Sequence, residues 1–322
     1  AKLKDPGATM SFEPLTEERI ETDSTYDAGT TTQLMWGARS DVGCVRPHNE
    51  DSYLVQSPLF CVCDGMGGHA AGEVASSIAV ETIAKTAPQS ADAARLAAAV
   101  EAANAAVIEA ALNGLGKPGM GCTATCAYIE NDTLAIAHVG DSRAYLLHEG
   151  TLIRVTRDHS YVEELVDAGE ITADEARVHP NRSVITRALG SDPAMYADHF
   201  TLHIEEGDRL ILCSDGLSSM IPDSDIENIA TQSSTAQICV DNLVDAALAA
   251  GGHDNVTVVV VDLVDDGVMR EAQRVRRRNV TIGVVLGLVL VLAAAIWAYT
   301  GVTGSYYLGT YQGNVAVWRG LP

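Results

Sequence analysis

The stretch FCVCDG at residues 60–65 is the best single indicator of the architecture of this 322-residue chain. Its short apolar run is typical of a buried strand, and the Asp-Gly pair that follows is typical of a turn. The pattern recurs in IAHVGDS at 136–142 and in LILCSDG at 210–216, and GGHDN at 251–255 stands just before the apolar run VTVVVV. Four strand ends that each carry an aspartate predict one polar site at the edges of a sheet structure.

These four aspartates point to a metal cluster. A single aspartate at a strand end is usually a turn former, but several carboxylates at one edge repel one another unless a cation neutralises them. Neighbouring glycines let the backbone approach a ligand. Oxygen ligands without an obligatory histidine or cysteine favour Mg²⁺ or Mn²⁺, and two such ions could share a water, lower its pKa and hold a phosphoryl group. Asp64, Asp141, Asp215 and Asp254 therefore predict hydrolytic chemistry.

A charged segment upstream, RPHNED at 46–51, fits the same chemistry. Arg46 offers a planar fork that matches phosphate oxygens, and Glu50 and Asp51 suit water-mediated contacts to a metal. Taken alone, this segment is also an ordinary charged loop. Among other histidines, His138 lies within a strand-like run and is interpreted as a core group, whereas His253 could orient the loop beside Asp254 or occupy a turn.

Residues 35–264 are predicted to form one mixed domain. Turns at Asn131-Asp132 and Glu149-Gly150 favour antiparallel hairpins and argue against a purely parallel, doubly wound sheet. The predicted strands are 53–55, 60–63, 124–130, 133–139, 144–148, 209–213 and 256–261, and the predicted helices are 70–86, 91–112, 161–168 and 235–250.

Composition excludes other classes of protein. The chain has 43 acidic and 21 basic residues, a formal charge of −22, so it repels nucleic acid, which is not expected as a partner. Seven cysteines are an odd number and do not indicate a disulfide framework, which favours a reducing compartment. Zinc binding by Cys61/Cys63 and Cys122/Cys126 is an alternative, but thiols inside strand-like runs are more often buried core residues.

The C-terminal part predicts a membrane anchor. Residues 280–300, VTIGVVLGLVLVLAAAIWAYT, carry no charge and would span roughly 30 Å as a helix, although a buried core helix is the alternative. Residues 265–279 form a basic linker with five arginines, whereas only Arg319 follows the apolar stretch. The positive-inside rule then places the domain in the cytoplasm of a single-pass protein of the cell membrane, with residues 301–322 outside. The arginines could also bind anionic lipid headgroups, but a role in topology alone is the favoured interpretation.

Residues 1–34 are polar and acidic, and we expect them to form a disordered tail. The chain lacks an initial methionine, and Met10 is a candidate for the native start. The alternating segment NVAVW at 314–318 resembles an incomplete strand, so a truncated C-terminal tail is also expected.

At the level of motifs, the chain resembles the bacterial metal-dependent serine/threonine protein phosphatases of the PPM (type 2C) family. Order and spacing agree across residues 36–264. The matching segments are RPHNEDS (46–52), CDGMGGHAAGEVAS (63–76), GCTAT (121–125), VGDSRAYL (139–146), TRDHS (156–160), NRSVITRALG (181–190), LILCSDGL (210–217) and GGHDNVTVVVV (251–261).

The resemblance implies an α+β fold, a four-layer α-β-β-α sandwich of two antiparallel sheets flanked by helices, here followed by one transmembrane helix. It implies a dinuclear Mn²⁺ or Mg²⁺ centre between the sheets. Asp64 would bridge the two ions, the Gly65 carbonyl would bind one of them, and Asp215 with Asp254 would bind the other.

The remaining assignments follow the same resemblance. Glu50 and Asp51 correspond to outer-shell carboxylates, and Asp141 would serve a weaker third ion. Arg46 corresponds to the arginine that binds phosphate, and His69 to the proposed general acid, within an expanded Asp-Gly-Met-Gly-Gly-His segment. Residues 158–187, called the flap segment below, resemble the variable flap beside the active site and are expected to gate the substrate.

The predicted function is hydrolysis of phosphoserine and phosphothreonine in proteins, which would reverse a cognate Ser/Thr kinase of the same membrane. A membrane-tethered pseudophosphatase that binds phosphorylated partners is the alternative, and its expected mark, a missing metal ligand, is absent from the sequence. A metal-dependent nuclease is a third interpretation, which the acidic charge disfavours.

Overall fold

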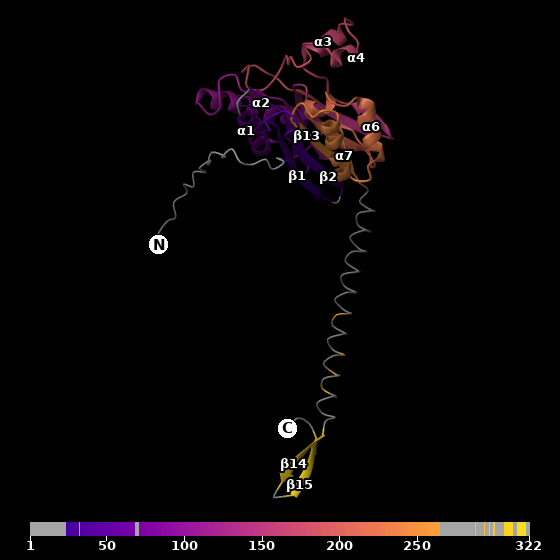
Figure 1. The fold of residues 1–322 in the computed structure, drawn as a ribbon. Coiled ribbons are helices and arrows are strands. Elements are labelled where there is room, and N and C mark those ends of the chain that lie inside the picture. The colour runs from indigo at the N-terminus through magenta and orange to yellow at the C-terminus, as the bar shows by residue number, and fades with distance from the viewer. Residues whose placement is uncertain are drawn as a thin grey trace, which may run out of the picture. The chain divides into compact units, whose positions relative to one another are not determined.

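The computed structural model describes residues 24–31, 33–67 and 71–264, and further along the chain residues 287, 293, 296, 299, 306–311 and 314–319. The chain divides into two compact units, residues 1–263 and 264–322. The first unit contains two antiparallel sheets and flanking helices (Figure 1).

The first sheet has six strands in the order β1-β2-β13-β12-β9-β10. Neighbouring strands all run antiparallel, and the hairpin between β9 and β10 turns at Glu149-Gly150 as predicted. Both residues of this turn have positive φ, the geometry that tight hairpins require. The strands are β1 (Thr25–Thr30), β2 (Leu34–Asp41), β9 (Arg143–His148), β10 (Thr151–Arg154), β12 (Arg209–Cys213) and β13 (Val256–Leu263).

The second sheet has five antiparallel strands in the order β11-β8-β7-β4-β3. Its β7–β8 hairpin turns at Asn131-Asp132, again as predicted. The strands are β3 (Ser52–Gln56), β4 (Leu59–Cys63), β7 (Ala124–Glu130), β8 (Thr133–Val139) and β11 (Asp198–His203). A separate two-stranded ribbon pairs β5 (Gly65–Met66) with β6 (Gly121–Cys122).

Helices cover the outer face of each sheet, which confirms the four-layer arrangement. Helices α1 (Ala71–Thr86) and α2 (Ala93–Leu112) pack on the second sheet. The first sheet is covered by α5 (Asp215–Ser218), α6 (Asp223–Gln232) and α7 (Ala236–Ala249). Helix α7 begins at the Thr235 cap, whose side chain accepts the Ile238 N–H, and stops before two glycines with positive φ.

Three apolar clusters fill the interfaces between layers. One lies between the two sheets and contains Phe60, Ile136, Leu212 and Val259, all fully buried. The other two lie between each sheet and its helices. Close packing of both sheet faces fixes the register of the strands, because a shift by one residue would turn the apolar face outward.

Three buried thiols lie close together on strands β4 and β7 of the second sheet. Cys61 and Cys126 lie opposite each other on β4 and β7, with their Sγ atoms 2.8 Å apart, and Cys63 Sγ lies 3.7 Å from Cys61 Sγ. All seven cysteines are free thiols. Six of them are buried, as expected of core residues, and only Cys44 is exposed.

The predicted disordered tail is wrong for its last part. Residues Thr25–Thr30 form the edge strand β1, which pairs with β2 along its whole length. Tyr26 stacks on Arg39, and the Ser24 hydroxyl donates to Asp41. Backbone pairing with an open sheet edge needs no apolar pattern, so the sequence of this strand gave no signal. Residues 1–23 lie outside the described residues.

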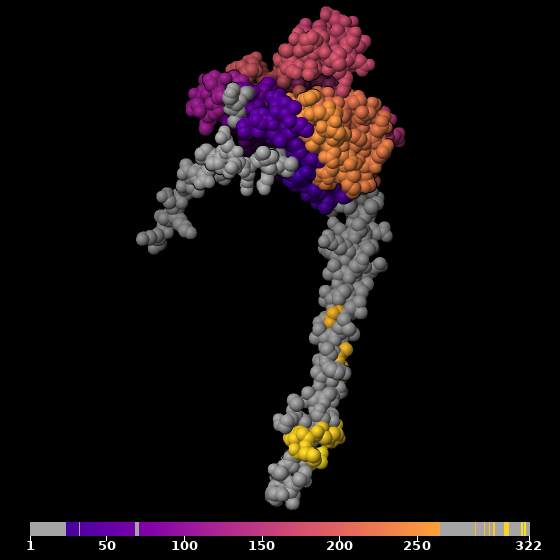
Figure 2. Space-filling model, in the orientation of Figure 1, coloured from indigo at the N-terminus to yellow at the C-terminus, as the bar shows by residue number. Residues whose placement is uncertain are grey.

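The flap segment carries two short helices, α3 (Tyr161–Asp167) and α4 (Ala173–Arg177). They form a lobe that stands out from the sandwich (Figures 1 and 2). Few of its side chains are buried, and polar contacts connect it to the rest of the domain, among them one from Arg177 to the Ser218 carbonyl oxygen and one from Glu163 to Arg154.

The second unit is described only in part. Strands β14 (Tyr306–Tyr311) and β15 (Asn314–Arg319) form an antiparallel hairpin. The predicted linker at 265–279 lies outside the described residues, and so does the predicted membrane helix apart from four positions that are helical. No helix made of described residues has the length and apolar character that a membrane crossing needs.

Candidate metal centre

A cavity of about 760 Å³ brings most of the predicted site residues together. Its lining includes all four strand-end aspartates, together with Gly65, Glu50 and Arg46. Asp51 lies behind this lining, buried against β13. His69 falls within residues 68–70, which lie outside the described residues.

Both sheets contribute carboxylates to the cavity. Asp64 follows β4 and Asp141 follows β8, so these two come from the second sheet. Asp215 follows β12 as the first residue of α5, and Asp254 precedes β13, so these two come from the first sheet. The cavity therefore lies where strand ends of the two sheets face each other.

Gly65 is held in a space that excludes any side chain. A Cβ atom at this position would lie 2.3 Å from the Glu50 carbonyl oxygen and 2.4 Å from the Gly72 carbonyl oxygen. The Asp64 peptide is fixed as well, because its N–H donates to Thr123 Oγ1 and its carbonyl accepts the Thr123 N–H. The Asp64-Gly65 backbone is thus rigid where the resemblance places two metal ligands.

Asn255 holds the Arg46 loop against the cavity, a role that the sequence did not indicate. Its amide donates to the carbonyl oxygens of Val42 and His48, and its side-chain oxygen accepts the Glu50 N–H. Asn255 directly follows Asp254, and this position was the sequence feature that could have indicated its role. The contacts themselves join residues more than 200 positions apart, so the sequence does not show them.

The buried carboxyl groups have strongly raised pKa values. Burial, together with the charges of Asp215 and Asp254, raises the pKa of Asp51 to about 7, although hydrogen bonds from Thr257 and Ser214 act against the rise. Burial raises the pKa of Asp64 well above its usual range, and repulsion by Asp51, Asp215 and Asp141 adds to the effect.

Asp141 and Asp215 follow the same trend. Burial and the charge of Asp215 raise the pKa of Asp141 well above its usual range. The pKa of Asp215 rises to about 6 through burial and the charge of Asp254, while a hydrogen bond with the Asp64 side chain lowers it. The proton of this hydrogen bond therefore resides on Asp64, because two carboxylates in direct contact would repel each other if both were ionised.

Arg46 is paired with one of the predicted metal ligands. Its guanidinium donates to Asp254 Oδ2 at 2.7 Å, and this pairing raises the pKa of Arg46. The Arg46 side chain is half exposed, so the ion pair is weak and can be exchanged for a phosphate group.

His138 is a core residue, as the sequence indicated. Its Nδ1 atom lies 2.9 Å from Thr125 Oγ1 and its Nε2 atom 3.0 Å from the Arg157 carbonyl oxygen. Burial, with repulsion by His159, lowers the pKa of His138 to about 4. His253 lines a second cavity of about 550 Å³, which shares Arg46 and Asp215 with the first and extends under the flap segment.

The donor set fits hard divalent cations. Asp51 Oδ1 and Asp141 Oδ1 are buried oxygens without a hydrogen-bond partner, and the cavity offers carboxylate and carbonyl oxygens. Within the described ranges, no three acidic, histidine or cysteine side chains are gathered closely enough to hold an ion as they stand. The carboxylates would have to close around the cations, whose charge would remove the repulsion that raises their pKa values.

Comparison with known proteins agrees with this arrangement. The family model described as protein phosphatase 2C matches residues 37–256. The serine/threonine protein phosphatase PstP of Mycobacterium tuberculosis is 43% identical over 244 residues, which cover 74% of this chain and 46% of PstP. The chain therefore spans about half the length of this relative.

A second relative and a solved structure of the PstP catalytic domain extend the comparison. The serine/threonine phosphatase stp of Listeria monocytogenes is 37% identical over 236 residues, covering 70% of this chain and 94% of stp. The crystal structure of the PstP catalytic domain in complex with two manganese ions has a TM-score of 0.67 and 40% identity, and covers 72% of this chain and 99% of that one.

The family model covers most of the sandwich, and the solved relative has the same fold with manganese bound. The acidic cavity is lined by the aspartates of the matching motifs, Asp64, Asp141, Asp215 and Asp254. From these findings we conclude that the chain belongs to the protein phosphatase 2C family.

Proposed function

We propose that this protein hydrolyses phosphoserine and phosphothreonine in other proteins, with two Mn²⁺ or Mg²⁺ ions and a weaker third ion. The observation that carries the proposal is the oxygen-lined cavity in which buried aspartates from both sheets raise one another's pKa beside Arg46. Asp64, the Gly65 carbonyl, Asp215 and Asp254 would hold the two main ions, and Asp141 the third. Glu50 and Asp51 would contact bound water.

The protein's own residues have separate roles in this reaction. The bound cations would supply Lewis-acid chemistry, offsetting phosphoryl charge and lowering the pKa of water. Arg46 would exchange Asp254 for two phosphate oxygens and orient the phosphoryl group. His69 would donate a proton to the departing alkoxide, a contribution of about 10²- to 10⁴-fold.

The proposal is tested with Asp215→Asn and Asp254→Asn, assayed on a phosphothreonine peptide across a Mn²⁺ titration. We expect each variant to lose at least about 100-fold in turnover. Asp241→Asn on α7 is the control and should behave like the wild type. Undiminished Mn²⁺-dependent turnover in both site variants would exclude the proposed centre, and inactive wild type that still binds phosphopeptide would support the pseudophosphatase.

The role of His69 has its own test. His69→Ala should slow hydrolysis of phosphopeptides more than that of aryl phosphates, because aryl leaving groups depart without a proton. Equal losses on both substrates would argue for a positional role instead.

We further propose that residues 280–300 anchor the protein in the cell membrane with the phosphatase domain in the cytoplasm. The uncharged stretch and the arginines before it support this. The full chain should resist alkaline extraction from membranes, and a chain lacking residues 265–322 should be released. Release of both would reject the anchor.

The proposed partners are phosphorylated proteins and a cognate Ser/Thr kinase of the same membrane. Phosphoproteomics after acute depletion of the phosphatase should show phosphosites that rise within minutes. If kinase and phosphatase act on the same sites, those sites should fall when the kinase is inhibited.

A further inference from the structure

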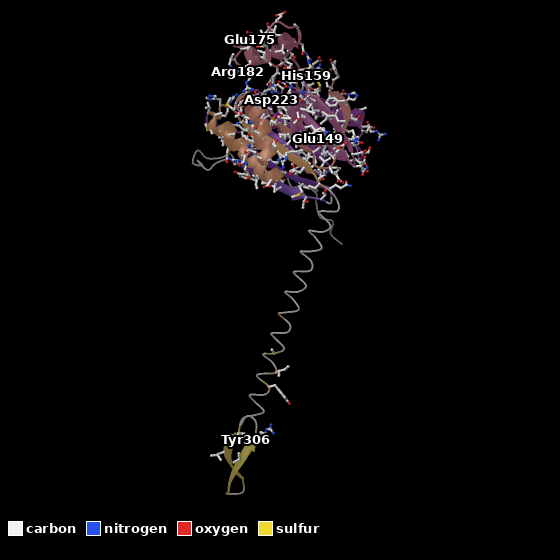
Figure 3. The ribbon with its side chains drawn as sticks, turned by 90° about the vertical axis from the view of Figure 1, so that its right-hand side faces the viewer. Glu149, His159, Glu175, Arg182, Asp223 and Tyr306 are labelled. Carbon is white, nitrogen blue, oxygen red and sulfur yellow. The ribbon has the colours of Figure 1, made fainter. Side chains whose placement is uncertain are left out.

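The two ends of the flap segment meet at His159. The His159 carbonyl accepts the Thr186 N–H at 2.8 Å, and Ser160 forms an isolated β-bridge with Ile185. Figure 3 shows His159 between the lobe that carries Glu175 and the body of the domain that carries Glu149. His159 therefore lies at the base of the lobe, where the chain leaves the body of the domain and returns to it.

His159 also fixes the residue that precedes Asp141. The His159 N–H donates to the Gly140 carbonyl at 2.7 Å, and the Gly140 N–H donates to His159 Nδ1 at 3.0 Å. One residue thus satisfies both backbone polar groups of Gly140. The next side chain along, that of Asp141, lines the cavity and has a buried oxygen without a partner.

The opposite edge of the ring reaches the end of the flap segment. Because Nδ1 accepts a hydrogen bond from a peptide N–H, the ring proton resides on Nε2, which lies 3.0 Å from Asp198 Oδ2. The other oxygen of Asp198 accepts a hydrogen bond from Arg187 at 2.6 Å. A single neutral tautomer therefore connects the Asp141 loop to Arg187.

The surroundings of the ring keep it in this state. The side chain is 3% exposed and stacks on His138 with the ring centroids 5.0 Å apart. Burial lowers the pKa of His159 although Asp198 opposes the shift, and Arg187 and Arg157 contribute to the lowering. The neutral form is the one that can accept from Gly140 and donate to Asp198 at once.

We propose that His159 is a positioning residue that couples the flap segment to the metal centre. Through Nδ1 it sets the Asp141 loop, and through Nε2 and Asp198 it sets the end of the flap segment. The inference rests on the proposed function, since it concerns how that site is organised. It differs from a purely structural role, in which the ring fills space and both nitrogen atoms matter only for stability.

Two isosteric exchanges separate the functions of the ring nitrogens. In His159→Asn the amide oxygen takes the place of Nδ1 and can accept from Gly140, but contact with Asp198 is lost. In His159→Gln the longer amide reaches the place of Nε2 and can donate to Asp198, but Gly140 loses its acceptor. Asp198→Asn weakens only the hydrogen bond between His159 Nε2 and residue 198.

The measurements are Mn²⁺ binding to the full chain, followed by the EPR signal of free Mn²⁺, and kcat and KM on a phosphothreonine peptide at saturating Mn²⁺. We expect His159→Gln to weaken the weakest Mn²⁺ site about 10-fold. His159→Asn should change Mn²⁺ binding by less than about 2-fold but raise KM for the peptide about 3- to 10-fold, and Asp198→Asn should follow it.

His148 offers a matched control, because its Nδ1 atom pairs with Asp208 at 2.7 Å on the first sheet. His148→Asn and His148→Gln should leave both readouts at wild-type values. Identical Mn²⁺ curves for the two His159 variants would overturn the proposal, whatever their thermal stability. Because Mn²⁺ binding is measured without turnover, an inactive wild type would reject the proposed function while the binding comparison still decides the role of His159.

Discussion

Arg46 competes with the proposed cations for Asp254. In the described structure its guanidinium occupies one oxygen of that carboxylate and adds positive charge to the cavity. Both effects oppose cation binding, so Arg46→Gln should bind Mn²⁺ about 2- to 5-fold more tightly, a modest gain because the pair is half exposed. The same variant should hydrolyse a phosphopeptide more slowly. Isothermal titration with Mn²⁺ and steady-state kinetics measure the two effects.

Arg95→Gln is a suitable control, since Arg95 pairs with Asp92 at the start of α2, outside the lining of the cavity. Arg95→Gln should leave both the Mn²⁺ affinity and the rate of phosphopeptide hydrolysis unchanged. Weaker Mn²⁺ binding by Arg46→Gln would show that the ion pair organises the carboxylate rather than competing for it.

The raised pKa values predict how pH and metal act together on stability. Asp51 and Asp215 have pKa values of about 7 and about 6 in the folded protein, above their usual value of 3.8. The folded metal-free protein then binds more protons than the unfolded chain, so these groups favour folding at low pH and lose that contribution as pH rises from about 4 to about 7. His138 has the opposite effect, because its lowered pKa removes stability as pH falls from 6.5 to about 4.

The effect of His138 is present with and without a cation, so it cancels in a difference. The rise in Tm that Mn²⁺ produces relative to EDTA should therefore increase between pH 5.5 and pH 7.5. Asp64→Asn, which removes a carboxyl group that has to lose its proton before it can hold a cation, should flatten this dependence. A difference in Tm that is constant with pH would show that the aspartates are not the ligands.

At the level of elements, β1 shows that the domain begins before residue 35. It contributes a row of backbone hydrogen bonds and the stacking of Tyr26 on Arg39, but little apolar burial. Removing residues 1–31 should lower the Tm by roughly 2–4 °C relative to removing residues 1–23. It also exposes the edge of β2, so size-exclusion chromatography should show more self-association. Equal Tm and elution of the two chains would mean that β1 adds nothing to the domain.

Elements with an apolar pattern could be predicted from the sequence, and those without could not. Strands 124–130, 133–139 and 209–213 have the predicted bounds because each apolar run ends at a turn or just before a neighbouring glycine and aspartate. Strand β11 was missed although it alternates, since its less exposed face begins with the charged Asp198 and no turn signal marks its start. Helix α6 was missed because it is polar on its outer face and only ten residues long.

The residues of the candidate site also fall into those that the sequence predicted and those that it did not. Its carboxylates could be predicted because they repeat one local pattern at four strand ends. Asn255 and His159 could not, because their roles come from hydrogen bonds to residues distant in sequence, which only the assembled sheets bring near.

For the molecule as a whole, metal affinity should depend on how the two sheets pack. Asp64 and Asp141 come from one sheet and Asp215 and Asp254 from the other, so cations bound between them would connect the two layers. Ile136→Val, in the cluster between the sheets, should cost about 1 kcal/mol and weaken Mn²⁺ binding. Ile226→Val, in the outer helical layer, should cost a similar amount without affecting Mn²⁺. Equal Mn²⁺ affinities in the two variants would show that metal binding does not depend on the packing between the two sheets.

The opposed thiols of Cys61 and Cys126 have a consequence for how this sequence can evolve. The Ile129 N–H donates to the Pro58 carbonyl, so the alternation of the ladder makes Cys61 and Cys126 a pair without mutual backbone bonds, where side chains approach most closely. With sulfur atoms 2.8 Å apart and no exposed surface, neither position can accept a larger side chain while the other stays as it is. Across descendants of this protein the two positions should therefore change together, with a side chain larger than cysteine at one position accompanied by a smaller one, such as alanine or glycine, at the other.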